Sequence, residues 1–512
     1  MEAASLPRAR SASLAERLGE AVRTRSRAFW IVLGLTALGA VLRFATLGVQ
    51  AYHHDEIVTA SRVLRVGFGH AMDAVGFSES APPLYYALAW LWTQVTGTSE
   101  WGLRSLSALA GVLTIPVAYF VGRELRGRRT GLLAAALVAV NPMLLWYSQE
   151  ARAYALLGLF CALSLLFFVR AAQDGTRRDF TWWGTFSALA LATHYFAVFP
   201  LIAEVLLLLR RRGRAILPGL WILTLVAALL APLAYHQMSY GHAEWIGKFS
   251  LGHRLGETAI TFVVGETGDI IGRVEQPDPA LLPLALVFAA FVLLALRGTR
   301  GERRAAFLPL AVGATAIVVP LLLAIGPGGK DFVLARNLLP ALFPLLLAVA
   351  VALTIERARR LGGAIAALLV AYSLGFCIWA SASPDLHRPD WEAVAERLGE
   401  PDGPRATVTW VIGEAPLRYY LSTGAIQVEA SEGYDWLVRE VNFVSIGEAP
   451  PPPQRLMGPG FRETAYEEVG ELFIRRYRVP GPELVPLQLK TLRDADTNFR
   501  NNGVLLDGIG PG

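Results

Sequence analysis

The amino-acid sequence predicts a polytopic α-helical membrane protein with a small α/β domain at its C-terminal end. Hydrophobic residues make up 54% of the 512 positions and charged residues only 17%, whereas soluble domains carry about 25% charged residues. Apolar runs of the roughly 20 residues that one crossing needs recur between residues 28 and 380. After residue 381 the composition becomes more polar. These observations predict a transmembrane domain at 28–380 and a separate domain behind it.

The first apolar run covers residues 28–49 and follows a polar, arginine-rich stretch at 1–27. This run is longer than the apolar core of a cleavable signal peptide, which spans about 7–15 residues. We therefore expect a retained first transmembrane helix and a cytoplasmic N-terminal tail at 1–27.

Most other arginines gather in short clusters between apolar runs. The clusters are Arg123, Arg126, Arg128 and Arg129; Arg177 and Arg178; Arg210, Arg211, Arg212 and Arg214; Arg297, Arg300, Arg303 and Arg304; and Arg357, Arg359 and Arg360. Cytoplasmic loops of membrane proteins carry such an excess of positive charge. The net charge of +5 therefore reflects orientation in a cell membrane, and no nucleic-acid partner is expected.

Placing every cluster in the cytoplasm predicts about eleven crossings and an external C-terminus. The expected crossings are 28–49, 101–122, 130–147, 152–170, 180–194, 196–209, 215–238, 281–297, 305–325, 337–355 and 361–380. The apolar stretch 82–97 is short, so it is either an interfacial helix or a short crossing. Cys161 and Cys377 lie inside apolar runs and are interpreted as small core residues.

Residues 381–480 are expected to form the external α/β domain. Helical spacing covers residues 391–398 and 416–421, and strand patterns cover 406–412, 425–429, 441–446 and 471–478. The remaining residues, 481–512, are rich in proline and glycine and are expected to be a loose tail.

The first external loop, 50–81, contains the densest group of ionisable residues. His53, His54, Asp55 and Glu56 follow the first apolar run directly, and Tyr85 and Tyr86 stand in a Pro-Pro-Leu-Tyr-Tyr stretch behind the loop. Ionisable groups at a membrane surface are costly unless they are solvated or paired. They either belong to a solvated loop with an aromatic belt, or line a site in which a shielded carboxylate acts as a general base.

A second polar group stands in short turns between later crossings. One turn contains Gln149, Glu150 and Arg152, and another contains His194 and Tyr195. Glu150 and Arg152 either pair with each other to cap two helices or take part in chemistry. His194 either packs in the core or bonds a phosphate or a sugar hydroxyl.

Lys330 and Arg336 are expected outside, at the start of the crossing 337–355. An external arginine departs from the charge distribution of the rest of the chain, and its planar fork suits a lipid phosphate. Carboxylates and cations on one face are the groups needed to move a sugar from a lipid phosphate.

The order of these motifs resembles the family 39-type glycosyltransferases of the GT-C class, which are related to protein O-mannosyltransferases and to the lipid A aminoarabinose transferase. The motifs are HHDE, PPLYY, YSQEARAYAL, THYF, ARNLLPALFP and RPDWEAVAERL, and the likeness covers about residues 28–400. The resemblance implies a GT-C fold with about 11 to 13 transmembrane helices. It also implies inverting transfer of a hexose or pentose from a polyprenyl-phosphate donor to a lipid, glycan or protein hydroxyl.

The resemblance also implies roles for individual residues. Asp55 would be the general base, with Glu56 shaping the site, and Glu150 would orient the acceptor or the base. The substrate-binding candidates are His53, His54, Tyr85, Tyr86, Gln149, Arg152, His194, Tyr195, Lys330 and Arg336. One departure concerns the position before Pro-Pro, where relatives often carry Lys or His and this chain has Ala81.

No metal or other cofactor is expected, because four consecutive residues such as 53–56 seldom converge on a single ion. Two other functions remain open at this stage. A transporter or flippase of lipid-linked sugars would carry internal repeats and polar groups at mid-membrane. A membrane assembly protein would use its external domain to bind a partner.

Overall fold

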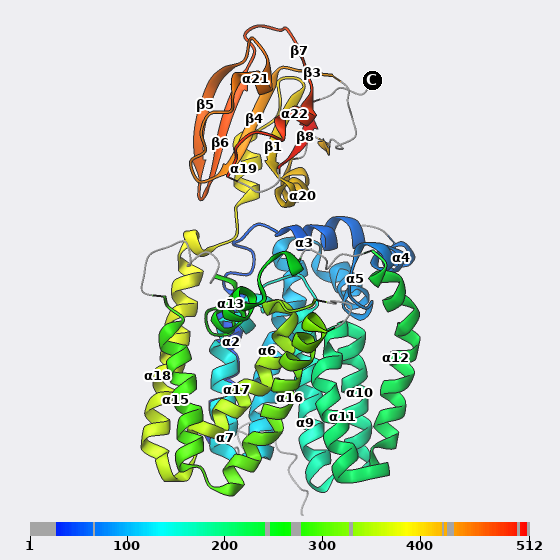
Figure 1. Ribbon diagram of the computed structural model, residues 1–512, viewed down its shortest axis with the longest axis vertical. Coiled ribbons are helices and arrows are strands. Elements are labelled where there is room, and N and C mark those ends of the chain that lie inside the picture. Colours follow the sequence, from blue (N-terminus) through cyan, green and yellow to red (C-terminus); the bar gives the residue numbers. More distant parts are fainter. Residues whose placement is uncertain are drawn as a thin grey trace, which may run out of the picture.

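The computed structural model describes residues 27–64, 67–240, 246–267, 278–326, 331–421, 424–427, 435–498 and 502–508. A bundle of long helices forms one end of the elongated molecule, and a sheet-containing domain stands on the opposite end (Figure 1). The two parts agree with the expected fold class, and the sheet-containing part, which begins at α19 (Trp391–Leu398), is called the external domain after its expected location.

Each of the eleven expected crossings coincides with helical structure. The helices are α2 (Arg27–Phe44), α6 (Glu100–Arg126), α7 (Arg128–Val140) with α8 (Pro142–Ser148), α9 (Tyr154–Asp174), α10 (Arg177–Thr193), α11 (Val198–Arg212), α12 (Leu217–Met238), α15 (Leu281–Arg297), α16 (Arg300–Ile325), α17 (Leu339–Leu353) and α18 (Arg359–Ala382).

Seven helical segments among the described residues are long and apolar enough to cross a membrane, or eight if the bent pair α7 and α8 is one span. The bend between α7 and α8 is 57° and falls at Asn141, where Pro142 opens the second helix. One of the seven segments joins α11 and α12, while α10 and α15 have 17 residues each. The chain is a multi-pass membrane protein.

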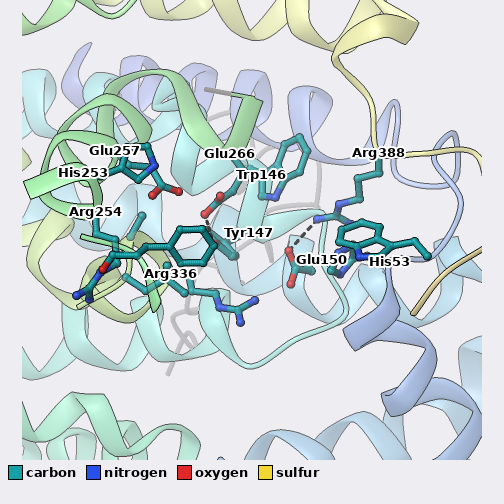
Figure 2. Close-up of a pocket in the computed structure, with 14 residues that line it drawn as sticks. His53, Trp146, Tyr147, Glu150, His253, Arg254, Glu257, Glu266, Arg336 and Arg388 are labelled. Atoms are coloured by element: carbon teal, nitrogen blue, oxygen red, sulfur yellow. Dashed lines mark hydrogen bonds and ion pairs between the residues drawn. The ribbon is translucent and has the colours of Figure 1, made fainter. Parts of the chain in front are cut away.

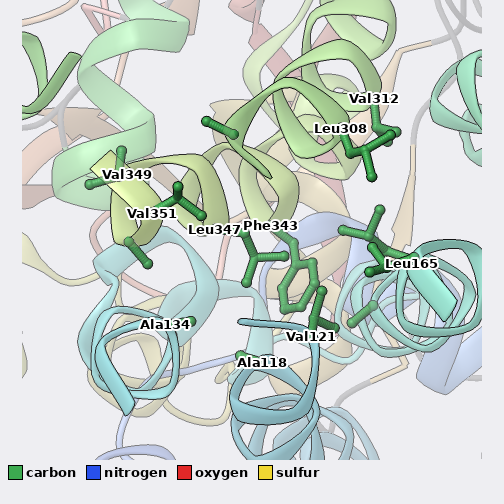
Figure 3. Close-up of a cluster of buried hydrophobic side chains, with 14 of the residues drawn as sticks. Ala118, Val121, Ala134, Leu165, Leu308, Val312, Phe343, Leu347, Val349 and Val351 are labelled. Carbon is green, nitrogen blue, oxygen red and sulfur yellow. The ribbon is translucent and has the colours of Figure 1, made fainter. Parts of the chain in front are cut away.

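Helix α17 lies at the centre of the bundle and is more buried than any other candidate span. Figure 3 shows Phe343 and Leu347 of this helix packed towards Ala118 and Val121 of α6. Lipid tails are as apolar as these side chains, so close van der Waals packing holds such helices together. Small residues permit the closest approaches: a Cβ added to Gly184 of α10 would lie 2.3 Å from the Gly219 backbone of α12.

Short helices cover the end of the bundle that faces the external domain (Figure 1). They are α3 (His54–Ile57), the π-helix η1 (Val58–Val63), α4 (Phe68–Ser78), α5 (Leu84–Thr96) and α13 (Leu251–Val264). Helix α5 has 13 residues and corresponds to the ambiguous stretch 82–97. It is too short to cross a bilayer, which needs roughly 20 residues, so the interfacial alternative fits the structure. The 3₁₀ turn η6 (Ala335–Leu338) leads into α17.

The external domain contains a six-stranded mixed sheet of order β2-β8-β1-β4-β6-β5 and a two-stranded sheet of β3 and β7. Its strands are β1 (Arg405–Trp410), β2 (Ile426–Gln427), β3 (Trp436–Val438), β4 (Glu440–Ile446), β5 (Arg462–Val469), β6 (Leu472–Arg478), β7 (Val485–Leu487) and β8 (Asn502–Asp507). Strands β1 and β4 are parallel, and the other pairs are antiparallel. Four helices accompany them: α19 (Trp391–Leu398), α20 (Val411–Tyr420), α21 (Gln454–Met457) and α22 (Leu489–Leu492).

The C-terminal segment differs from the expected loose tail at 481–512. Strand β8 pairs with β1 along its whole length, and Val504, Leu505 and Leu506 are at most 1% exposed. These consecutive apolar residues are buried on both faces of the sheet, which stabilises the strand. The sheet domain therefore extends to residue 507, and the boundary at 480 is wrong.

Candidate active site

A cavity of about 390 Å³ lies between the helical bundle and the external domain. Figure 2 shows its walls, which come from segments far apart in the sequence. The lining residues are His53, Trp146, Tyr147, Glu150, Phe249, His253, Arg254, Glu257, Glu266, Leu334, Ala335, Arg336, Arg388 and Trp410. Aromatic rings and charged groups of both signs thus line the same cavity.

Asp55 and Arg336 form an ion pair of 3.2 Å beside this cavity. The aspartate is in α3, and the arginine projects from η6 into the cavity. Burial by itself raises the pKa of Asp55, but Arg152 and Arg336 outweigh it, so this pKa lies well below its usual range. Asp55 is therefore an ionised carboxylate held by a cation that also faces the cavity.

Glu150 is one of the three carboxylates that line the cavity, together with Glu257 and Glu266 (Figure 2). It lies in the turn between α8 and α9, and its Oε2 accepts a hydrogen bond of 2.7 Å from Arg388. Burial, opposed by Arg388 and assisted by Glu56 and Asp55, raises the pKa of Glu150 to about 7. A carboxyl with this pKa exchanges a proton near neutral pH.

Glu56 lies beneath the cavity and is fully buried. Arg104 of α6 binds both its oxygens at 2.8 Å, and Arg388 donates to Oε2 at 2.9 Å. The backbone N–H groups of Ala151 and His53 donate to it as well. Both oxygens accept hydrogen bonds, so Glu56 ties α3 to α6. Its expected roles, in catalysis and in shaping the site, stay predictions.

Arg152 does not pair with Glu150, contrary to one alternative drawn from the sequence. It donates to Glu79 at 2.9 Å, to Thr59 at 3.1 Å and to the Asp55 carbonyl at 3.4 Å. The buried Glu79 also accepts a bond of 2.6 Å from Tyr86. Arg152 therefore holds the backbone of residues 50–64, which we call the first external segment, and Tyr86 contributes through Glu79.

Some of the other predicted binding residues lie at the cavity or are packed in the protein interior. His53 lines the cavity, and burial together with Arg388 lowers the pKa of His53 to about 4, so this ring is neutral. His194 packs against Tyr154 with 5.6 Å between ring centroids, and Tyr85 is fully buried. Lys330 lies outside the described residues.

Three predicted binding residues make their bonds away from the cavity. His54 bonds the Ile412 carbonyl of the external domain at 3.0 Å. Gln149 donates to Thr46 and to carbonyls at the end of α2, and Tyr195 donates to Gln237 of α12 at 2.8 Å. These side chains join structural elements and are not among the residues that line this cavity, so their expected binding role stays a prediction.

Sequence reasoning missed several charged residues that build the site. Arg104 and Arg388 bind Glu56, and Arg254 of α13 forms a two-pronged ion pair with Asp331 at the far end of the cavity. Arg104 stands inside a predicted crossing, where an arginine is costly, and this could have marked it. Arg388 opens the RPDWEAVAERL motif of the family resemblance, to which no role was assigned, and nothing in the spacing of Arg254 singles it out.

Within the described parts of the chain, no group of three or more His, Cys, Asp or Glu side chains is arranged to hold a metal ion.

Comparison with known proteins agrees with this architecture. The family model of dolichyl-phosphate-mannose-protein mannosyltransferases matches residues 80–236. The structure of ArnT from Cupriavidus metallidurans bound to undecaprenyl phosphate is similar over 88% of this chain and 98% of ArnT, with 14% identity and a TM-score of 0.54. The chain has a GT-C fold.

ArnT without ligand gives the same coverage and score. The oligosaccharyltransferase of Archaeoglobus fulgidus is similar at 15% identity, with 78% of this chain and 60% of that one covered and a TM-score of 0.44. No curated protein matches the sequence.

Proposed function

We propose that this GT-C protein is an inverting glycosyltransferase that moves a sugar from a polyprenyl-phosphate donor to a hydroxyl acceptor at the outer face of the membrane. The observation that carries the proposal is the ion pair of Asp55 and Arg336 beside a cavity that Glu150 and Arg388 also line. In this pair the carboxylate of Asp55 lies next to an arginine, a residue whose side chain suits phosphate. The family match over residues 80–236 and the fold shared with ArnT, whose structure contains undecaprenyl phosphate, support it.

Arg336 is the residue that we assign to the donor phosphate. Its side chain is 31% exposed and pairs with Asp55 at 3.2 Å through one guanidinium nitrogen. A guanidinium presents five donors in a planar arrangement that suits phosphate oxygens. This assignment also addresses the departure at Ala81, where the cation found in relatives is absent.

Asp55 is the residue that we assign as general base. In the transfer, the acceptor hydroxyl attacks the anomeric carbon and gives its proton to the Asp55 carboxylate. The bond from that carbon to the phosphate oxygen breaks, and the electron pair leaves with the phosphate. Attack from the side opposite the phosphate inverts the anomeric configuration. Arg336 would stabilise the charge that develops on the departing phosphate.

Phosphate binding would also change the state of Asp55. Arg152 and Arg336 together lower the pKa of Asp55, which makes this carboxylate a weak base. A donor phosphate that engages Arg336 competes for that cation, so the basicity of Asp55 rises once the donor is bound.

The orientation follows from the arginine clusters and not from the fold. We place the cavity and the external domain outside, with the N-terminus in the cytoplasm, because the clusters after α6, α9, α11, α15 and α17 lie at the end of the bundle away from the sheet domain. Polyprenyl-phosphate sugars in the outer leaflet would then reach the cavity, and the sugar is a hexose or a pentose.

The test is transfer in proteoliposomes. The wild-type protein should move a radiolabelled sugar from polyprenyl phosphate to a hydroxyl acceptor from the cell envelope, with inversion seen by NMR of the product. Vesicles in which the labelled lipid crosses the bilayer without sugar transfer would overturn the proposal in favour of a transporter.

A further inference from the structure

Arg388 lies in the junction between the membrane helices and the external domain. This junction, residues 387–390, separates the 3₁₀ turn η8 (Pro384–Leu386) from α19. Arg388 donates to Glu56 at 2.9 Å and to Glu150 at 2.7 Å. Its backbone N–H donates to the Gln50 side chain at 3.1 Å. One junction residue thus contacts both acidic segments of the site.

The guanidinium of Arg388 is enclosed and geometrically constrained. Its side chain is only 10% exposed, and it lies 4.7 Å from the centre of the Trp146 ring. Two charge-assisted hydrogen bonds and the ring leave it little freedom. Removing one partner of such a buried pair leaves the other charge uncompensated. Glu150 therefore depends on Arg388 for its orientation.

The external domain is seated on the same segment that carries Asp55. The hydroxyl of Tyr420 in α20 accepts a bond of 2.7 Å from the Tyr52 backbone and donates to Glu100 at 2.7 Å. His54 bonds the Ile412 carbonyl at 3.0 Å. Trp410, at the end of β1, forms part of the cavity wall. The domain thus bonds Tyr52 and His54, which precede Asp55 in the chain, and closes one side of the cavity.

We propose that Arg388 is a positioning residue for sugar transfer, and that it holds Glu150 at the cavity wall only while the external domain is seated on the first external segment. This inference rests on the proposed function and adds a role for the external domain to it. When the external domain packs on this segment, the junction brings Arg388 into contact with Glu150 and the site is complete.

Loss of Arg388 would change the protonation of Glu150 as well as its position. The charged groups that face Glu150 are Arg388 from the junction, Asp55 and Glu56 from α3, and Arg336 from η6, and the tyrosines that face it are Tyr85, Tyr147 and Tyr154. Arg388 opposes the rise in the pKa of Glu150. Without it, Glu150 holds its proton to a higher pH.

The first experiment measures initial transfer rates of purified protein in nanodiscs against donor concentration and pH. For R388Q we expect kcat to fall about 10- to 100-fold, as a displacement of about 1 Å costs. We expect an unchanged donor KM and an acid limb of the pH profile that moves to higher pH. R388K keeps the positive charge but loses the planar guanidinium, so its kcat should lie between those of R388Q and the wild-type protein. R397Q is the matched control, because Arg397 on α19 is 60% exposed and bonds Glu467 at 3.4 Å.

Two results would overturn this role for Arg388. A raised donor KM with unchanged kcat would make Arg388 a donor ligand. An unchanged kcat and pH profile, with only a lower melting temperature, would make it merely structural. Absence of transfer in the wild-type protein would instead contradict the proposed function, so the two failures are distinguishable.

A second experiment tests the seating of the domain without using activity. Y420F removes the hydroxyl that joins Tyr52 to Glu100 and leaves Arg388 intact. We expect limited proteolysis of the substrate-free protein to cut the junction several-fold faster in Y420F and R388Q than in wild type or R397Q. We also expect the acid limb of the pH profile of Y420F to move to higher pH, as it does for R388Q. If Y420F is cleaved at the wild-type rate and has the wild-type pH profile, the position of Glu150 does not depend on the seating of the external domain, and the proposal is overturned.

Discussion

Arg336 and Asp55 are 281 positions apart in the sequence, yet their side chains form an ion pair of 3.2 Å. The pair joins the first external segment to the start of the central helix α17. Because Arg336 also lines the cavity, a ligand that binds this arginine would lie next to the partner of Asp55.

Replacing Asp55 by Asn should reduce sugar transfer by about 10²- to 10⁴-fold, the contribution typical of a general base. The amide keeps the shape of the side chain but accepts no proton. The measurement is transfer of radiolabelled sugar in membranes, at equal amounts of folded protein. D73N is the control, since Asp73 is exposed on α4. Full activity of D55N would exclude Asp55 as the base.

Replacing Arg336 by Lys should raise the donor KM about tenfold, because the planar fork is lost while one charge remains. The control is R357Q, which removes an exposed arginine of the turn η7 (Glu356–Ala358). Saturation kinetics with purified donor give the result. A wild-type KM in R336K would show that another group binds the phosphate.

Replacing Arg104 by Met should destabilise the protein by about 3–5 kcal/mol, because it leaves the fully buried Glu56 without its two-pronged partner. Thermal unfolding in detergent measures this loss. The matched control is R129M, whose arginine is 53% exposed and pairs with Glu356 at 3.5 Å; such surface pairs contribute about 0–1 kcal/mol. Equal melting temperatures for the two variants would contradict the anchoring role of Glu56.

Glu150 should make stability depend on pH in a specific direction. Its pKa is about 7 in the folded protein, against an ordinary value of 4.5. Between these values the folded state binds more protons than the unfolded state, so the contribution of Glu150 to stability falls as pH rises from about 4.5 to 7. The melting temperature of E150Q relative to wild type should therefore increase across this range. A constant difference would show that the pKa of Glu150 is not raised.

Replacing Leu506 by Asp should unfold the external domain, because it buries a charge in the middle of β8, where the side chain is 1% exposed. Limited proteolysis should then degrade residues beyond the junction while the helical bundle survives. L484D is the control, since Leu484 is 41% exposed. Survival of the domain in L506D would contradict the assignment of β8 to the sheet.

Local sequence patterns predicted the elements whose stability is local. Trp391–Leu398 is a helix with the expected bounds, and β4 and β6 lie within one residue of the expected strands. Strand β8 was missed because its apolar residues follow a stretch rich in polar and turn-forming residues. Its strand conformation depends on pairing with β1, about a hundred residues earlier in the chain.

The site was predictable in part for the same reason. Asp55, Glu150 and Arg336 stand out because each is an ionisable residue at the end of an apolar run, where burial is costly. The residues that hold them do not stand out. Arg388 looks like an ordinary arginine at the start of a soluble domain, and only its contacts with Glu56 and Glu150 reveal its importance.

The sequence by itself determined that this chain crosses a membrane many times and ends in a small sheet domain, because length and hydropathy of a segment decide whether it can cross a bilayer. It also determined which acids and cations stand at one end of the helices. Only the tertiary structure decided the partner of each charge: Glu56 with Arg104, Glu150 with Arg388, and Arg152 with Glu79. Ion pairs form between groups that folding brings within about 4 Å, and that distance bears no relation to their separation along the chain.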